Sequence, residues 1–354
     1  MSRPNHGHGR APVCLLGADV LFDEATAEAF AARHDHLEVR RVRYSEPSEL
    51  RRARGTGAVA PKVAALAPPL SAEDRAALRD AVAVLALDLP DRIAELAPEL
   101  RLVQAYGAGV EWLLVHDLER HGIQLTNARG IAAPSIAEFV MARLLQVWKD
   151  LPRIDAQQRD HLWRPRWATE VAGRTLGVVS LGAIGRATAS RAKAFGMRVV
   201  ATRRSAGPGA QDPDADELWP TDLLDEVLGR CDAVLVSAPA TQETADLFDA
   251  ARFAAMKPGA VFVNVSRGSL VDEPALVDAL ESGHLGAAVI DVTKEEPTPP
   301  DHPFWDAPNL LLSPHCSTSF DHYSERLLDL FAENVGRLGD GQPLVNVVDR
   351  DRGY

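Results

Sequence analysis

Three ionisable side chains in the C-terminal half of the chain each follow a short apolar run: Arg267, Glu296 and His315. A guanidinium group offers a planar pair of N–H donors to a carboxylate or a carbonyl oxygen. An imidazole gives or takes a proton near neutral pH, and a neighbouring carboxylate keeps it charged until the proton is needed. Together the three side chains could bind an oxoanionic substrate and transfer a proton to it.

The apolar runs before these residues are predicted strands, at Ala260–Val265, Ala287–Ile290 and Leu310–Ser313. In an open α/β sheet, ligands bind outside the carboxyl ends of the strands, so the three side chains should face one crevice. Taken singly, each has an ordinary alternative, as a salt-bridged surface arginine, a loop glutamate or a structural histidine. The hypothesis depends on their joint placement after a nucleotide-binding unit.

That unit is the stretch Arg174–Ser205, which is typical of a strand, a glycine-bearing turn, an amphipathic helix and a second strand. The strands are expected at Leu176–Ser180 and Met197–Ala201, in the order of a dinucleotide-binding βαβ unit. Gly182 would let the backbone approach a pyrophosphate, and Gly185 would let the helix lie close to the strand. The helix N-terminus would present N–H groups to the phosphates. Cofactor contacts are therefore expected at Ser180, Gly182, Ala183, Ile184 and Gly185.

Two departures from the GxGxxG pattern bear on the cofactor. Ser180 stands where the first glycine belongs, and Arg203 stands where an acidic residue would hold the adenosine ribose. An acidic residue there would repel a 2′-phosphate, whereas Arg203 and Arg204 attract it and Ser205 can hydrogen-bond to it. We therefore predict NADP(H) as the preferred cofactor. The alternative is NAD(H), with the two arginines merely solvated.

Strand and helix patterns alternate along the rest of the chain, which predicts parallel sheets with helices on their faces. Further strands are expected at Val13–Leu16, Leu37–Val42, Val63–Leu66, Val82–Leu87, Leu100–Ala105, Ile123–Asn127 and Ala233–Ser237. Helices are expected at Glu24–Arg33, Thr221–Leu228, Glu273–Glu281 and Thr318–Leu338, with an extended segment at Pro343–Val348.

Another long helix is predicted to begin at Ser135, which would form a capping box with Glu138 three residues later. Pro152 interrupts the helical pattern, and the polar segment that follows carries Trp163 and Trp167. These tryptophans either pack in a core or an interface, or contact a substrate.

Composition narrows the class of protein. A chain of 354 residues is long enough for two domains with separate cores. The net charge of −12 argues against a nucleic-acid partner or an anionic membrane surface. The three cysteines form no CxxC pair and are expected to be reduced thiols of a cytoplasmic protein. No apolar run approaches the ~20 residues that cross a bilayer.

The first ten residues lack the apolar core of a signal peptide and are expected to form a disordered tail. His6 and His8 could bind a metal adventitiously there, but no physiological metal site is expected.

Four ordered blocks now identify a family: SLGAIGRATASRAKAFGMRV, NVSRGSLVDEPALVDAL, AAVIDVTKEEP and LLSPHCST. They resemble the D-isomer-specific 2-hydroxyacid dehydrogenases, and the resemblance covers nearly the whole chain. It implies that Arg267, Glu296 and His315 are catalytic and that Asp291 orients the nicotinamide. Further cofactor contacts are expected at Pro239, Ser266 and Ser317. A backbone loop that binds the substrate carboxylate is implied at Gly107, Ala108, Gly109 and Val110. The alternative is that these residues form only a tight strand–helix turn.

The resemblance also implies a fold of two Rossmann-like, doubly wound parallel-sheet domains, with the cofactor domain inserted into the substrate domain. The substrate domain would comprise residues 11–127 and 318–354, and the cofactor domain residues 128–317, with hinges near Asn127–Ser135 and Pro314–Phe320. A homodimer is expected.

The stretches VQAYGAGVEWLL and WRPRW are similar to the glyoxylate/hydroxypyruvate reductase branch. In that branch an aromatic arm from a partner subunit can approach the active site, and Trp163 is the candidate. Phosphite-oxidising relatives tend to carry a lysine where Ala108 stands, which argues against phosphite. The expected reaction is hydride transfer between NADP(H) and a small 2-oxo or 2-hydroxy acid. The alternatives are a specialised acid of a biosynthetic pathway and an NAD(H)-sensing corepressor.

Overall fold

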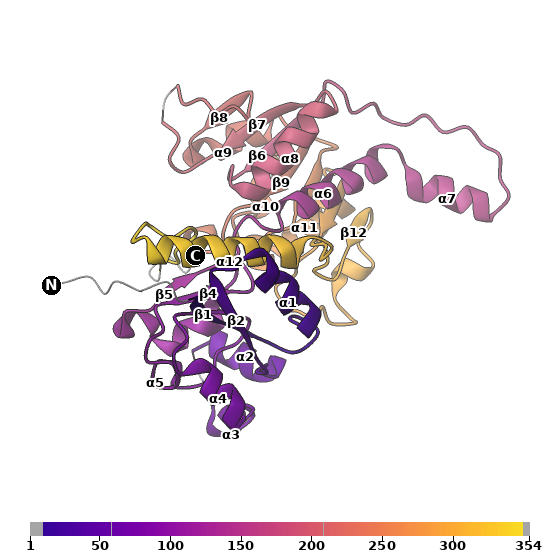
Figure 1. Ribbon diagram of the computed structural model, residues 1–354. Helices are drawn as coiled ribbons and strands as arrows, with labels where there is room; N and C mark the ends of the chain where they lie inside the picture. Colours follow the sequence, from indigo (N-terminus) through magenta and orange to yellow (C-terminus); the bar gives the residue numbers. More distant parts are fainter. Residues whose placement is uncertain (1–9, 58, 208, 350–354) are drawn as a thin grey trace. The chain divides into compact units, whose positions relative to one another are not determined.

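Residues 10–57, 59–207 and 209–349 are described by the computed structural model, and they form two units, each with its own parallel sheet (Figure 1). The second unit runs without interruption from Ala132 to Ser319, and the first consists of the described residues before and after it. The prediction that one α/β domain is inserted into another is thereby confirmed. Residues 1–9 of the expected tail, including His6 and His8, lie outside the described residues.

The sheet of the first unit contains β1 (Ala11–Leu16), β2 (Leu37–Val42), β3 (Ala83–Ala86), β4 (Leu102–Ala105) and β5 (Gln124–Thr126). The strands are all parallel and lie in the order β2-β1-β3-β4-β5, which is the doubly wound order of flavodoxin-like sheets. Every residue of β3 and β4 is buried, as expected for strands covered by helices on both faces.

The helices of the first unit are α1 (Glu24–Arg33), α2 (Ser48–Gly55), α3 (Pro61–Ala64), α4 (Ala72–Leu78), α5 (Ile93–Leu96), the 3₁₀ turns η1 (Glu111–His116) and η2 (Leu118–His121), and α12 (Tyr323–Gly339). Helix α12 buries Leu327, Phe331 and Val335, which recur at the spacing of one helical face. After it the chain returns as an extended segment, and Val347 pairs with Thr126 of β5 in an antiparallel bridge.

The sheet of the second unit contains β6 (Thr175–Val179), β7 (Arg198–Thr202), β8 (Glu217–Trp219), β9 (Ala233–Val236), β10 (Val261–Asn264), β11 (Ala287–Ile290) and β12 (Leu310–Leu312). Its order is β12-β11-β10-β9-β6-β7-β8, and all pairs are parallel. The winding direction reverses between β6 and β9, which places the ligand crevice of such sheets beyond the end of β6.

The helices of the second unit are α6 (Ala133–Trp148), α7 (Leu151–Arg159), α8 (Ala183–Ala194), η3 (Thr221–Leu223), α9 (Leu224–Leu228), η4 (Gln242–Thr244), α10 (Ala250–Ala255), η5 (Gly268–Leu270), α11 (Glu273–Glu281) and η6 (Pro303–Trp305). Among the described residues, no helix has the length and hydrophobicity needed to cross a membrane.

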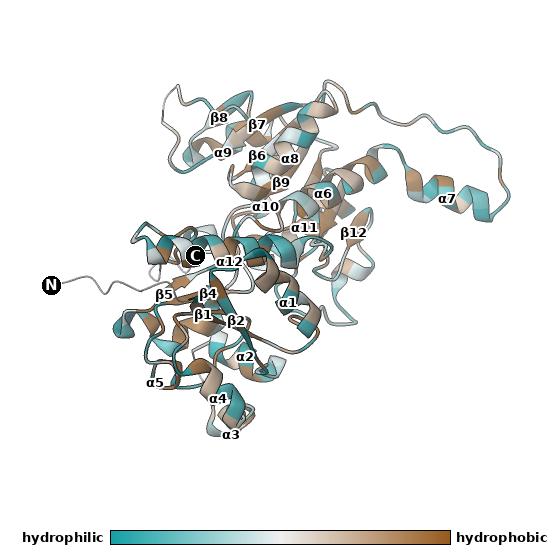
Figure 2. Cartoon of the chain, viewed as in Figure 1, coloured by the Kyte–Doolittle hydropathy of each residue, from teal (hydrophilic) through white to brown (hydrophobic). Residues whose placement is uncertain are grey.

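Two hydrophobic clusters cover the opposite faces of this sheet. Successive residues of a strand point to opposite faces, so Val199 and Ala201 of β7 belong to one cluster and Val200 to the other. Phe262 of β10 is fully buried in the cluster that α9, α10 and α11 cover. Figure 2 shows hydrophobic colouring along many of the strands.

Several sequence predictions fail locally. Val63–Leu66 is not a strand: the helix α3 begins at Pro61, a residue that suits the first turn of a helix because it needs no N–H donor there. The capping box at Ser135 is also absent, because α6 begins two residues earlier and Pro134 lies in its first turn. The Ser135 hydroxyl donates to the carbonyl of Ala132, and Glu138 pairs with Arg191 of α8 instead.

The three cysteines of the sequence are free thiols. Cys14 and Cys231 are buried, and burial raises the pKa of each to about 12, while Cys316 is exposed.

A buried ionic cluster lies beyond the ends of β2 and β3. Glu46 pairs with Arg54 at 2.8 Å, and Arg51 donates two hydrogen bonds of 2.7 Å to Asp88. Asp88 also accepts the backbone N–H of Glu46 at 3.0 Å, which joins the two pairs. Breaking a buried pair by removing one partner typically costs about 3–5 kcal/mol, so this cluster ties α2 to the sheet.

His116 of η1, close to this cluster, gives unfolding a defined pH dependence. Burial, together with the nearby charge of Arg54, lowers the pKa of His116 to about 4, below its ordinary value of 6.5. Between these two pH values the unfolded chain binds the proton and the folded chain does not, so stability falls as pH drops from 6.5 to 4. We expect His116→Gln to flatten this part of the stability curve, as measured by urea unfolding at each pH. An unchanged difference between pH 6.5 and 4 would contradict this expectation.

Candidate active site

The three strands that precede the ionisable residues are neighbours in the second sheet. Arg267 follows β10, Glu296 follows β11 and His315 follows β12, and these strands lie side by side in parallel. Their carboxyl ends therefore meet at one edge of the sheet, and the structure brings all three residues to that edge.

His315 and Glu296 form a hydrogen-bonded pair. Nδ1 of His315 lies 2.8 Å from Oε2 of Glu296. Because a carboxylate only accepts hydrogen bonds, Nδ1 carries the proton and Nε2 is the ring nitrogen left to meet a substrate. The side chains are 50% and 40% exposed, so the pair is accessible from solvent.

The backbone around His315 is held by Asp291, the residue that directly follows β11. His315 has a φ of 50°, and its N–H donates to the carbonyl of Asp291 at 2.8 Å. The buried carboxylate of Asp291 accepts hydrogen bonds from Ser313 at 2.7 Å, from the Cys316 N–H at 3.0 Å and from the Ser317 N–H at 3.1 Å. Asp291 and Ser317 thus fix the histidine loop in this chain, and their contacts with a cofactor remain predictions.

Arg267 is followed by Gly268, a position where only glycine fits. A Cβ atom built on Gly268 would lie 2.0 Å from the carbonyl carbon of Thr293 and 2.3 Å from the amide nitrogen of Lys294. The loop after β10 therefore packs backbone against backbone with the loop that carries Glu296. The side chain of Asn264 donates to the carbonyl of Arg267 at 2.9 Å and fixes this turn from the end of the strand.

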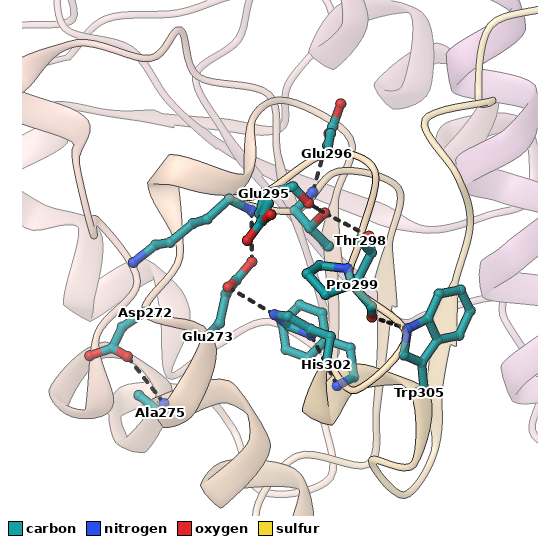
Figure 3. Close-up of polar contacts among 12 residues, drawn as sticks. Asp272, Glu273, Ala275, Glu295, Glu296, Thr298, Pro299, His302 and Trp305 are labelled. Atoms are coloured by element: carbon teal, nitrogen blue, oxygen red, sulfur yellow. Dashed lines mark hydrogen bonds and ion pairs between the residues drawn. The ribbon is translucent and has the colours of Figure 1, made fainter.

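Glu273, in the first turn of α11, braces the loop that carries Glu296 (Figure 3). Its Oε1 accepts the backbone N–H of Lys294 at 2.8 Å, and its Oε2 lies 3.3 Å from Nε2 of His302. Within the same loop the Thr293 N–H donates to Glu296 Oε1 at 3.3 Å. The acid that orients His315 is thus anchored through two neighbouring residues to a helix.

We expect Glu273→Ala to lower the free energy of unfolding by about 0.5–1.5 kcal/mol, because it removes the carboxylate that accepts the Lys294 N–H. It should also lower kcat by more than it raises KM, since Glu296 loses its fixed position. Asp278→Ala is the matched control, because Asp278 is an exposed acid of the same helix. Equal effects of the two substitutions on melting temperature and kcat would rule out the bracing role.

The glycine-bearing turn lies between β6 and α8, beyond the point where the winding direction of the sheet reverses. A Cβ on Gly185 would approach Cγ1 of Val178 to 2.7 Å, so the absence of a side chain lets α8 lie against β6, as predicted. A Cβ on Gly182 would meet no protein atom within 4 Å, so the space before it is open. Ser180 adopts a φ of 74°, the left-handed conformation that favours glycine, and its carbonyl accepts from the Ser237 hydroxyl at 2.8 Å. The serine therefore keeps the turn that a glycine would make.

The remaining predicted cofactor residues lie around this edge. Ala183 and Ile184 form the first turn of α8, which begins without a side-chain cap. Arg203, Arg204 and Ser205 follow β7; Arg203 pairs with Asp212 at 2.9 Å, Arg204 lies 3.5 Å from Glu243, and Ser205 is exposed. Pro239 follows β9, and Ser266 lies between Asn264 and Arg267, where its hydroxyl donates to the carbonyl of Ala238.

The predicted substrate loop belongs to the first unit. Gly107, Ala108, Gly109 and Val110 follow β4, and neither glycine has a positive φ. Two hydrogen bonds fix the backbone of this loop. The Ala128 N–H donates to the Gly107 carbonyl and the Asn127 side chain donates to the Ala108 carbonyl, each at 3.0 Å. Trp163 belongs to the second unit, where it is 98% exposed in the single chain.

Four residues around the site were not found from the sequence: Gly268, Glu273, Asp212 and Arg186, which donates two hydrogen bonds to Asp212. Gly268 and Arg186 each stand directly after a residue that the sequence did single out, and that adjacency is the signal that was available. Asp212 and Glu273 act through partners distant in sequence, so no local pattern marks them. The described residues contain no group of His, Cys, Asp and Glu that could hold a metal ion.

Comparison with known proteins gives one consistent result. A family model described as the NAD-binding domain of D-isomer specific 2-hydroxyacid dehydrogenases matches residues 141–317. The chain is 33% identical over 279 residues to a glyoxylate reductase of Korarchaeum cryptofilum, covering 77% of this chain and 83% of that protein. It is 34% identical over 299 residues to a D-3-phosphoglycerate dehydrogenase of Mycobacterium tuberculosis, covering 77% of this chain and 56% of that longer protein.

Among solved structures, one similar chain is the NADPH-dependent glyoxylate/hydroxypyruvate reductase of Sinorhizobium meliloti in complex with NADP and sulfate. The TM-score is 0.72 at 26% identity, with 98% of this chain and all of that chain covered.

Proposed function

This chain belongs to the D-isomer specific 2-hydroxyacid dehydrogenase family and is an NAD(P)-dependent oxidoreductase of CH–OH donors, and we propose that it is an NADP(H)-dependent reductase of small 2-oxo acids. The observation that carries the proposal is the His315–Glu296 pair at 2.8 Å, placed with Arg267 beyond the ends of three adjacent strands. The similar glyoxylate reductases support the substrate class. A cytoplasmic location is proposed with it.

The residues of the second unit fit a dinucleotide. The open space before Gly182 and the uncapped N-terminus of α8 suit a pyrophosphate, because both offer backbone N–H donors to an anion without a side chain in the way. Arg203, Arg204 and Ser205 would hold a 2′-phosphate, which favours NADP(H) over NAD(H).

The chemistry divides between the cofactor and this chain's side chains. When bound, the nicotinamide supplies the hydride that the carbonyl carbon of the 2-oxo acid accepts. His315 gives the proton at Nε2 to the carbonyl oxygen, while Glu296 holds Nδ1 and stabilises the charged ring. Arg267 polarises the carbonyl and binds the carboxylate. That the N–H groups of Gly107–Val110 bind a substrate carboxylate stays a prediction of the family resemblance. In the opposite direction His315 takes the proton back from the hydroxyl group.

A panel of 2-oxo acids tests the proposal. Glyoxylate, hydroxypyruvate, pyruvate and phenylpyruvate are each mixed with the full chain and NADPH or NADH, and the loss of cofactor absorbance is followed. We expect glyoxylate or hydroxypyruvate to give the highest kcat/KM, and NADPH to exceed NADH. Equal kcat/KM values with the two cofactors would overturn the NADP(H) preference, and no turnover of any acid would overturn the substrate class.

A second candidate substrate has a specific observation in its favour. The 34% identity to a D-3-phosphoglycerate dehydrogenase points to a phosphorylated hydroxy acid of a biosynthetic pathway. Adding 3-phosphohydroxypyruvate to the same panel separates the two candidates, because a reductase of small acids should turn it over poorly.

We also propose that the enzyme is a homodimer. The segment that includes α7 leaves the body of the second unit after α6 and extends outward (Figure 1). It carries large hydrophobic side chains that the single chain leaves exposed: Leu151, Ile154, Leu162, Trp163 and Trp167. Such exposure is typical of a surface that a second copy covers.

Light scattering tests the dimer and should give twice the mass of the chain. The double substitution Trp163→Ser with Trp167→Ser should shift the measured mass toward that of the monomer. A monomeric parent protein would refute the proposal.

A further inference from the structure

A carboxylate occupies the place where the sequence predicts only positive charge. Asp212 lies in the connection between β7 and β8, and its side chain is only 5% exposed. Arg186 of α8 donates two hydrogen bonds of 2.7 Å to it, one to each oxygen. Arg203 donates a third, from Nη1 to Oδ2 at 2.9 Å. Both guanidinium groups thus share one acid.

Arg186, Arg203, Asp212 and Asp214 form a cluster whose charges balance. Arg186 also pairs with Asp214 at 2.6 Å, so two arginines face two aspartates. The hydrogen bonds from Arg186, above all, lower the pKa of Asp212 to about 2, so Asp212 is ionised at neutral pH. A 2′-phosphate that approaches Arg203 therefore meets a guanidinium that is already neutralised by a carboxylate.

The two arginines hold Asp212 unequally. Arg186 binds it through both nitrogens, whereas Arg203 uses one, and the side chain of Arg203 is 33% exposed. Nε of Arg203 is buried and has no hydrogen-bond partner among the residues that the structure describes. Arg203 can therefore turn to an incoming phosphate while Arg186 keeps Asp212 in place.

We propose that Asp212 sets the selectivity between NADP(H) and NAD(H), by competing with the 2′-phosphate for the guanidinium of Arg203. The inference rests on the proposed function, since it concerns the same cofactor site. It makes Asp212 a specificity-determining residue that moderates the NADP(H) preference that the arginines alone would give. NAD(H) carries no 2′-phosphate, so its binding does not require Arg203 to leave Asp212.

The test compares Asp212→Asn with Asp214→Asn. Both remove one negative charge from the cluster, but among the described residues Asp214 pairs with Arg186 and not with Arg203, so it is the matched control. Dissociation constants for NADPH and NADH are measured on the full chain from the quenching of tryptophan fluorescence. Asp212→Asn should shift the ratio of the two constants about tenfold toward NADPH, the size expected when one charged hydrogen-bond acceptor stops competing. Asp214→Asn should leave the ratio within about twofold.

Asp212→Ser serves as a second variant that removes the same charge, and circular dichroism confirms that each variant is folded. In an Arg203→Gln background the Asp212 substitution should no longer change the ratio, because the competing partner is gone. An unchanged ratio in both Asp212 variants, or an equal shift in Asp214→Asn, would overturn the inference and leave the proposed function standing. Failure of the parent chain to bind either dinucleotide would overturn both.

Discussion

His315→Ala is expected to lower kcat by roughly 10²–10⁴-fold, the usual contribution of a positioned general acid. The structure leaves Nε2 as the only ring nitrogen of His315 that can face a substrate, because Nδ1 is held by Glu296. Alanine removes the proton donor and leaves Arg267 and the dinucleotide turn in place. Steady-state kinetics with NADPH and the preferred 2-oxo acid measures the loss.

Two controls accompany this experiment: the dissociation constant of NADPH and the substitution of a second histidine. The dissociation constant of NADPH should stay within about twofold in His315→Ala, because the proton donor is not part of the dinucleotide turn. His36→Ala removes an exposed histidine of the first unit and should leave kcat unchanged. Full turnover in His315→Ala would remove the histidine from the mechanism.

Gly268→Ala is expected to destabilise the second unit by about 3 kcal/mol, at the upper end of what one added methyl group costs in a packed site. The new Cβ would lie 2.0 Å from the Thr293 carbonyl carbon, and a backbone atom cannot rotate away as a side chain does. In a unit of this size about 3 kcal/mol corresponds to a fall of roughly 6–12 °C in melting temperature. Activity should fall as well, because the loops that carry Arg267 and Glu296 must separate.

Gly336→Ala is the control for this substitution. Gly336 lies in helix α12, where a Cβ meets no atom within 4 Å, so alanine there should be neutral or stabilising. Thermal unfolding followed by circular dichroism compares the variants. A melting temperature of Gly268→Ala equal to that of the parent chain would show that the two loops do not need this close contact.

Much of the fold follows from local patterns in the sequence. The helix Glu273–Glu281 and the strand Ala287–Ile290 were predicted with the bounds that the structure has, because capping residues and fully buried apolar runs mark them. The run Val63–Leu66 was assigned wrongly, since a four-residue apolar run fits a buried strand and a helix equally well. The edge strand β8 was missed because it has three half-buried residues and a charged end.

The candidate site, too, could be predicted from the sequence only in part. Arg267, Glu296 and His315 could be found because each follows its own strand and parallel strands end at one edge. The pairing of Arg203 with Asp212 could not, because it depends on how the connection after β7 folds back onto α8. The demand for glycine at position 268 likewise comes from Thr293 and Lys294, whose approach no local pattern reveals.

The central claim is that this chain transfers a hydride to the carbonyl carbon of a 2-oxo acid to form the D-isomer. The most direct measurement uses NADPH deuterated at nicotinamide C4 on the transferred side, with hydroxypyruvate as substrate. We expect D-glycerate with one deuterium at C2, the label being read by mass spectrometry and the isomer by chiral chromatography. Glycerate without deuterium from either face of C4, or the L-isomer, would contradict it.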